Sequence, residues 1–150
     1  MWDPENIPWD EYDALIRKML KPSRYKHSRC VMERAVELAE KNGADVIKAK
    51  LAGLLHDIMK NVPEKEMLQF IEDSGIILLY ADLCAPQLWH AIAGAAYLKE
   101  KLGIDDPDVI NAVRYHTTGR AGMSKLEKVV YLADLTSADR DYPDVKKARK

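Results

Sequence analysis

Apolar residues recur every three or four positions along most of the chain, which is the spacing of one face of an α-helix. The first such segment carries Trp9, Tyr12, Leu15, Ile16, Met19 and Leu20. Pro22 ends this pattern, because the residue before a proline disfavours helical backbone. A second helix is predicted to begin after Ser23, acting as its N-cap, and to stop at Gly43.

A third helix is predicted after Asp45, whose carboxylate can accept hydrogen bonds from its free N–H groups. Its apolar pattern is broken by Asn61 and Pro63, so the pair His56 and Asp57 falls in its last turns. A short helix is expected around residues 67–71. The run GIILLYADL at 75–83 is expected to be helix or loop, since no second strand is available to pair with it.

Three further helix starts can be read from the second half of the chain. Pro86 opens a helix that runs to Gly103 and is rich in small residues, and Asp106 caps another that begins with a proline. Ser124 and Glu127 match the capping box, in which a hydroxyl and a carboxylate three residues apart satisfy free N–H groups. The predicted fold class is therefore all-α.

Length and composition indicate one globular domain over residues 1–150. An apolar fraction of 47% with 31% charged residues is typical of a soluble protein, and no apolar run reaches the ~18 residues that suggest a membrane span. The N-terminus lacks a secretory signal, and the two distant cysteines give no disulfide framework. We therefore expect a cytoplasmic protein that does not bind membranes.

The net charge of −1 provides no overall field that would attract nucleic acid. The part of the chain from Arg114 onward is more basic, which we interpret as a solvated face. A nucleic-acid site there would require steep salt dependence and aromatic residues to stack on bases, and this part of the sequence does not interleave aromatic residues with its basic ones.

His56 and Asp57 offer two kinds of metal ligand from adjacent positions, about 100° apart on a helix. His27 and Asp134 are the natural additional ligands, because an aspartate inside the apolar run VVYLADL is costly to bury without a cation. Two imidazoles and two carboxylates suit Fe, Mn, Co or Zn, and the lack of thiolates argues against a closed structural zinc site. We expect a catalytic metal with open coordination positions.

Three other residues extend this site. Lys60 follows the pair by about one turn and offers a positive charge to a bound phosphate. His90 and His116 could ligate a second ion bridged by Asp57, or they could donate hydrogen bonds to phosphate. The spacing leaves both roles open.

Several longer segments carry a family resemblance: KAKLAGLLHDIMK, LWHAIAGA, VINAVRYHTTGRAGMSKLEKVVYLADLTSADR and YPDV. Together they resemble the YqeK-type HD-domain family, the bacterial symmetrical bis(5'-nucleosyl)-tetraphosphatases, over most of residues 23–145. The resemblance implies an all-helical HD-domain bundle that binds iron and cleaves diadenosine tetraphosphate, a dinucleoside polyphosphate, into two ADP. It also implies a C-terminal helical tail beyond a single HD domain, and we expect that tail to be absent from residues 1–150.

The resemblance implies metal ligands at His27, His56, Asp57 and Asp134. We expect catalytic roles for Asp57, Lys60, His90 and His116. The expected substrate-side positions are His27, Lys60, His90, His116, Thr117, Thr118, Gly119, Arg120 and Arg140.

Other functions are compatible with the same residues. The same HD ligands serve nucleotidases and guanosine alarmone hydrolases, and a non-catalytic nucleotide-binding HD module is the alternative outside the enzymes. The number of metals, the substitution of iron by Mn, Co or Zn, and a homodimer also stay open at this stage.

Overall fold

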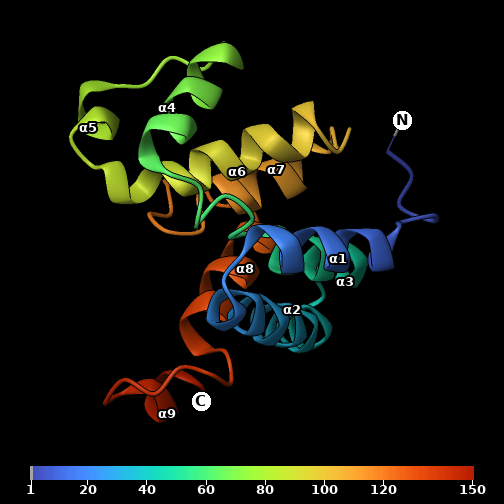
Figure 1. Cartoon of the computed structure of the whole chain (residues 1–150). Coiled ribbons are helices and arrows are strands. Elements are labelled where there is room, and N and C mark those ends of the chain that lie inside the picture. The colour runs from blue at the N-terminus through green and yellow to red at the C-terminus, as the bar shows by residue number, and fades with distance from the viewer. Residues whose placement is uncertain (1) are drawn as a thin grey trace.

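A computed structural model describes residues 2–150 and shows helices joined by turns, with no strand in this range (Figure 1). The elements in chain order are α1 (Trp9–Met19), α2 (Pro22–Asn42), α3 (Val46–Leu55), α4 (Glu64–Asp73), α5 (Tyr80–Leu83), the 3-10 helix η1 (Pro86–Leu88), α6 (Trp89–Glu100), α7 (Pro107–Arg114), α8 (Lys125–Thr136) and α9 (Val145–Ala148). The predicted all-α class is confirmed. No helix in the described range is long and apolar enough to cross a membrane.

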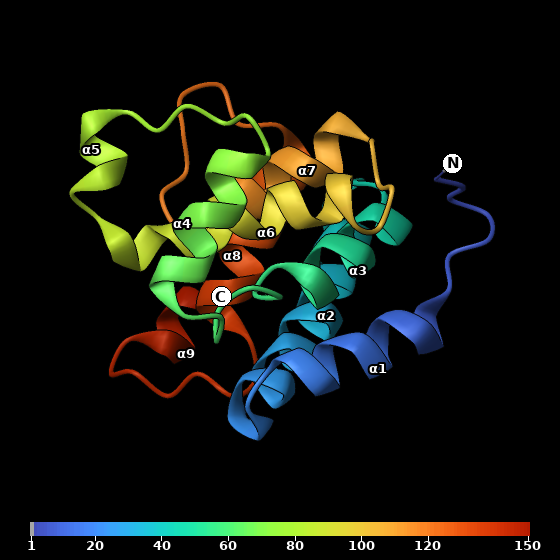
Figure 2. The same cartoon turned by 45° about the horizontal axis from the view of Figure 1, so that its top comes forward.

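Two groups of helices meet at the centre of the molecule. The long helix α2 packs against α3 and α8, while α6 packs against α4 and α7. Contacts of α7 with both α3 and α8 join the two groups, as the two views in Figures 1 and 2 show. The histidines described below come from both groups, so the fold brings them to the junction.

Close packing between α2 and α3 depends on a glycine. A Cβ atom added at Gly53 would lie 3.0 Å from the Cα atom of Met32 and 3.2 Å from the Cβ atom of Ala35. Contacts this short would force the two backbones apart. Gly53 therefore sets the distance between α2, which carries His27, and α3, which leads to His56.

Three predicted helix caps are present. The carboxylate of Asp45 accepts a hydrogen bond from the N–H of Lys48 at 3.0 Å, and the carboxylate of Asp106 accepts from Asp108 and Val109. The hydroxyl of Ser124 accepts from the N–H of Glu127 at 3.1 Å. Only this half of the predicted capping box is formed, because the Glu127 carboxylate instead accepts from Arg120.

The predicted N-cap of α2 is wrong by two residues. Lys21 is the N-cap and Pro22 is the first helical residue, so Ser23 lies inside the first turn. A proline fits this position because its fixed φ is helical and the N–H that it lacks would have no partner there. The predicted stop at Gly43 is confirmed, with a left-handed φ of 70°.

Helix α3 ends earlier than its apolar pattern predicts. Its last residue is Leu55, His56 is the C-cap, and turns follow through Asn61. The Nδ1 atom of His56 donates to the carbonyl oxygen of Gly53 at 2.7 Å. That oxygen would accept the N–H of Asp57 in a continuing helix, so the histidine side chain replaces the next helical bond. Asp57 therefore lies in a turn, where its direction is independent of the helix.

Candidate metal centre

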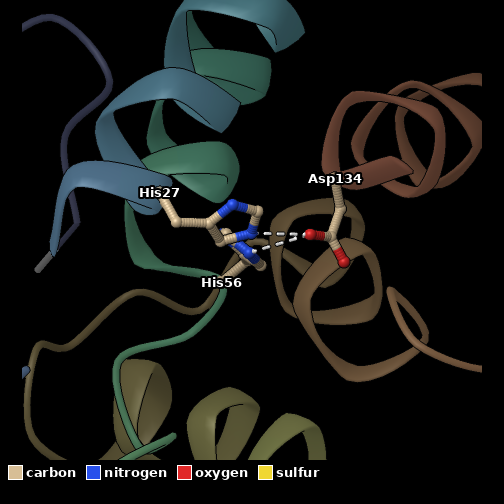
Figure 3. Close-up of side chains that lie close together, drawn as sticks. All are labelled: His27, His56 and Asp134. Atoms are coloured by element: carbon tan, nitrogen blue, oxygen red, sulfur yellow. Dashed lines mark hydrogen bonds and ion pairs between the residues drawn. The ribbon is translucent and has the colours of Figure 1, made fainter. Parts of the chain in front are cut away.

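Six of the predicted site residues lie together at the junction of the two helix groups. His27 comes from α2, His56 and Asp57 from the end of α3, and His90 from α6; His116 follows α7, and Asp134 lies on α8. All of them are buried except Asp134, whose side chain is 18% exposed. Figure 3 shows His27, His56 and Asp134 pointing toward one another from three separate segments.

Three of the histidines are oriented in the same way. The Nδ1 atoms of His56, His90 and His116 bond to the backbone carbonyls three residues earlier, at 2.7, 3.0 and 2.6 Å. In a neutral imidazole this leaves Nε2 with a free lone pair. The three Nε2 atoms each lie 3.4 Å from a carboxylate oxygen of Asp57, which is itself only 1% exposed.

This arrangement requires a cation. Neutral Nε2 atoms and carboxylate oxygens are all acceptors, and acceptors facing one another in a buried site repel unless a proton or a metal ion lies between them. The Nε2 atoms of His56 and His116 find no hydrogen-bond partner within residues 2–150. Histidines held in this way through Nδ1 present Nε2 as a metal-bound histidine does, so these nitrogens could ligate an ion.

The electrostatics of the cluster agree with this reading. Burial opposes a charge on His56, but Asp57 and Asp134 outweigh it and raise the pKa of His56 to about 10. Burial alone would raise the pKa of Asp57, yet His56, His116 and His90 hold it well below its usual range. Burial dominates for His116, whose pKa is lowered. The carboxylates therefore stay ionised and attract positive charge to this point.

Two overlapping sets of ligand atoms could hold an ion. His27, His56 and Asp134 form one set, and His56, Asp57 and His116 form the other, with ligand atoms within 4.8 Å of one another in each. The Nε2 atoms of His27 and His56 lie 2.8 and 3.7 Å from Oδ1 of Asp134. Ligands of one ion at about 2.1 Å are roughly 3–3.5 Å apart, so the residues fit a transition metal without large movement.

Two residues that the sequence analysis did not select belong to the cluster. Asp139 accepts a hydrogen bond from Nδ1 of His27 at 2.7 Å, and the guanidinium of Arg24 contacts the Asp57 carboxylate. Arg24 could have been found, because it precedes His27 by three residues on the same helix face. Asp139 lies in the turn after α8, where no periodicity predicts its direction.

The predicted substrate-side residues do not all contact the cluster. Arg140 donates to Oδ1 and to the backbone oxygen of Asp134, both at 2.9 Å, and so borders the cluster. Arg120 forms a bidentate pair with the buried Glu127 at 2.6 and 3.0 Å, which gives it a structural partner. Lys60 is exposed and follows Asp57 by three residues.

Thr117, Thr118 and Gly119 form the turn that follows His116. Gly119 has a φ of 65°, and a Cβ there would lie 3.3 Å from the sulfur of Met123. The left-handed backbone therefore favours glycine here, while the flexible Met123 side chain would need only a small shift to admit a Cβ.

His27 on α2, the pair His56 and Asp57 after α3, and Asp134 on α8 fall within residues 24–139, which the HD domain family matches. A symmetrical bis(5'-nucleosyl)-tetraphosphatase of Bacillus subtilis strain 168 is 42% identical over 94% of this chain and 75% of the relative. One of Halalkalibacterium halodurans is 44% identical over 90% of this chain and 72% of the relative. The chain belongs to this YqeK-type family of HD-domain phosphohydrolases.

A solved structure supports the same assignment. A protein from Clostridium acetobutylicum, described as a predicted HD superfamily hydrolase involved in NAD metabolism, superposes with a TM-score of 0.92 at 38% identity. The match covers 99% of this chain and 76% of that protein. The HD-domain bundle implied by the sequence resemblance is confirmed.

Proposed function

We propose that this protein is a metal-dependent hydrolase that cleaves diadenosine tetraphosphate symmetrically into two ADP. The observation that carries the proposal is the buried Asp57 carboxylate, faced at 3.4 Å by three imidazole nitrogens. Such a cluster of imidazoles and carboxylates suits a transition metal. The names of the relatives supply the substrate class.

In this proposal His27, His56, Asp57 and Asp134 hold the metal, and iron is the metal we expect, with Mn, Co or Zn as substitutes. Mixed imidazole and carboxylate ligands without thiolate suit these ions. When bound, the ion supplies Lewis-acid polarisation of a phosphoryl oxygen and lowers the pKa of a water nucleophile. Asp57 and Asp134 stay ionised, as metal binding requires, and the ion would take the place of the proton that they favour on His56.

Basic side chains at the edge of the cluster would neutralise the polyphosphate. Arg24 contacts Asp57 through one arm, while its Nε atom is buried without an acceptor anywhere in residues 2–150. This free N–H can bond a phosphate oxygen beside the metal ligands. Lys60 and Arg140 add positive charge at the same edge. His90 and His116 then serve either as donors to phosphate or as ligands of a second ion.

We also propose that the protein acts in the cytoplasm on nucleotides, without nucleic acid as a partner. The net charge of −1 supports this, as do the two cysteines, which are both free thiols.

Product analysis tests the proposed reaction. Iron-loaded protein is incubated with diadenosine tetraphosphate, and the products are separated by anion exchange beside those of His56→Ala protein. We expect ADP alone from the wild type and no product from the variant. ATP with AMP would contradict symmetric cleavage while keeping a metallohydrolase. Release of nucleoside or pyrophosphate from other nucleotides would instead favour a nucleotidase or an alarmone hydrolase.

A further inference from the structure

Arg140 contacts two of the proposed metal ligands with one nitrogen. Its Nη2 atom lies 2.9 Å from Oδ1 of Asp134 and 3.4 Å from Nε2 of His27. Those two ligand atoms are themselves 2.8 Å apart, and Figure 3 shows them facing each other. Because Asp139 accepts the Nδ1 proton of a neutral His27, the Nε2 atom is an acceptor like the carboxylate oxygen. Arg140 therefore brings a positive charge and an N–H donor to the same pair of acceptors that would ligate an ion.

The guanidinium of Arg140 and a divalent ion would compete for these atoms. The Asp134 side chain is 18% exposed, so water screens charges beside it only weakly. Two cations held a few ångströms apart in such a place repel each other, and one carboxylate cannot neutralise both. An ion bound to His27 and Asp134 would therefore weaken the pair that Arg140 forms with Asp134.

Arg140 has a second place in which its charge can be neutralised. Its side chain is 36% exposed and lines a cavity of about 210 Å³ together with His116, Thr117 and Asp134. The Oγ1 atom of Thr117 is buried and has no hydrogen-bond partner within residues 2–150, so it offers a donor to a group in this cavity. Guanidinium groups bond phosphate oxygens in the same forked geometry that they use for carboxylates.

We infer that Arg140 exchanges partners when the metal binds: it leaves the Asp134 carboxylate and bonds a phosphate group of the substrate in this cavity. This inference rests on the proposed function, because it takes the anion to be the polyphosphate of that reaction. An anion that binds Arg140 removes a competing cation from the metal ligands. Metal and polyphosphate therefore strengthen each other's binding, as the reciprocity of coupled sites requires.

Removal of Arg140 separates competition with the metal from simple support of a ligand. In phosphate-free buffer, Arg140→Gln should bind Mn²⁺ about 5- to 150-fold more tightly than the wild type, which is the usual range of coupling between two sites. Competition with a chelator measures the affinity, and Mn²⁺ avoids oxidation of the metal during titration. Arg29→Gln is the matched control, because it removes the same charge from an arginine whose partner, Asp13, is not a ligand. Its affinity for Mn²⁺ should match that of the wild type.

Inorganic phosphate tests the other half of the exchange. Calorimetry with Mn²⁺-loaded protein should show about fivefold or greater weakening of phosphate binding in Arg140→Gln. The metal-free proteins should differ little, because Asp134 holds Arg140 there. Arg140→Met must repeat both results, since it keeps much of the apolar stem and removes the guanidinium.

Each outcome decides between the possible roles of Arg140. Weaker Mn²⁺ binding by the variants would make Arg140 a support for Asp134, and equal binding would mean that it does not compete; either result overturns the exchange. Phosphate binding that does not depend on Arg140 in the metal-loaded protein would also overturn it. Symmetric cleavage by a wild type whose variants bind metal no more tightly would refute only the exchange. Tighter metal binding by the variants of a protein that does not cleave the dinucleotide would retain the exchange with phosphate and refute the proposed reaction.

Discussion

The two carboxylates of the cluster are held in different ways. Asp134 is partly exposed, and its Oδ1 atom accepts from Arg140 and lies 2.8 Å from Nε2 of His27. Asp57 is almost fully buried. The Nε2 atoms of His56, His90 and His116 each lie 3.4 Å from one of its carboxylate oxygens. Asp134 is therefore paired with Arg140 and His27, whereas Asp57 is paired with Arg24 and also faces three histidine nitrogens that a shared cation could join.

The histidines show the same contrast. Backbone carbonyls hold Nδ1 of His56, His90 and His116, but the Asp139 carboxylate holds Nδ1 of His27. A carboxylate on the outer nitrogen raises the basicity of a histidine ligand more than a carbonyl does. In the proposed metal site, His27 would be the ligand made more basic by a carboxylate, and Asp57 would bring the nitrogens of three histidines to one point.

Substitution at Asp57 should have the largest effect. Asp57→Ala should lower turnover by about 10³-fold or more, because the ion contributes several kcal/mol to the transition state and this residue faces most of its ligands. Turnover of metal-replete protein and bound metal by mass spectrometry measure the effect. Circular dichroism should show a retained helical fold. Activity above a few per cent of wild type would remove Asp57 from the ligand set.

Substitution at Asp139 should have a smaller effect, on metal affinity. Asp139→Ala should weaken metal binding about 10- to 100-fold, the range expected for the outer partner of a ligating histidine. Asp139→Asn should lose less, because its amide oxygen still accepts from Nδ1 of His27. Competition with a chelator measures the affinity, and Asp141→Ala is the control, since Asp141 is exposed and lies two residues after Asp139. Equal affinities for all three variants would refute this role of Asp139.

Local signals in the sequence predicted the helices well. The caps at Asp45, Asp106 and Ser124 depend on one side chain and the next three residues, so they can be read without the fold. The prediction of Ser23 as the N-cap was wrong because Pro22 already serves as the first residue of the helix. The end of α3 was missed because a side-chain bond from His56 replaces a backbone bond, which apolar periodicity does not record.

The candidate site could be predicted in part. The unusual pair His56 and Asp57 and the aspartate in an apolar run signalled buried charge from the sequence alone. Asp139 carries no such signal, because its contact with His27 joins positions 112 residues apart through a turn. Arg120 illustrates the opposite case: its motif suggested substrate contact, while the packing supplies Glu127 as a partner.

The smallest effect should be a pH dependence of the chelator-treated protein. The folded pKa of His56 is about 10, above its ordinary value of 6.5, so its protonated form stabilises the fold below pH 6.5. This stabilisation is lost as pH rises toward 10. One pKa unit is about 1.4 kcal/mol, so the melting temperature should fall by at least about 3 °C over this range.

Comparison with a variant isolates this effect from other groups that titrate near pH 10. His56→Gln keeps a polar side chain that does not titrate, so its melting temperature should fall less steeply over the same range. Bound metal should flatten the wild-type dependence too, because the ion takes the place of the proton between His56 and the carboxylates. Identical slopes in wild type, variant and metal-loaded protein would mean that Asp57 and Asp134 do not hold a proton on His56. The contrast between the two sides of the cluster would then need another cause.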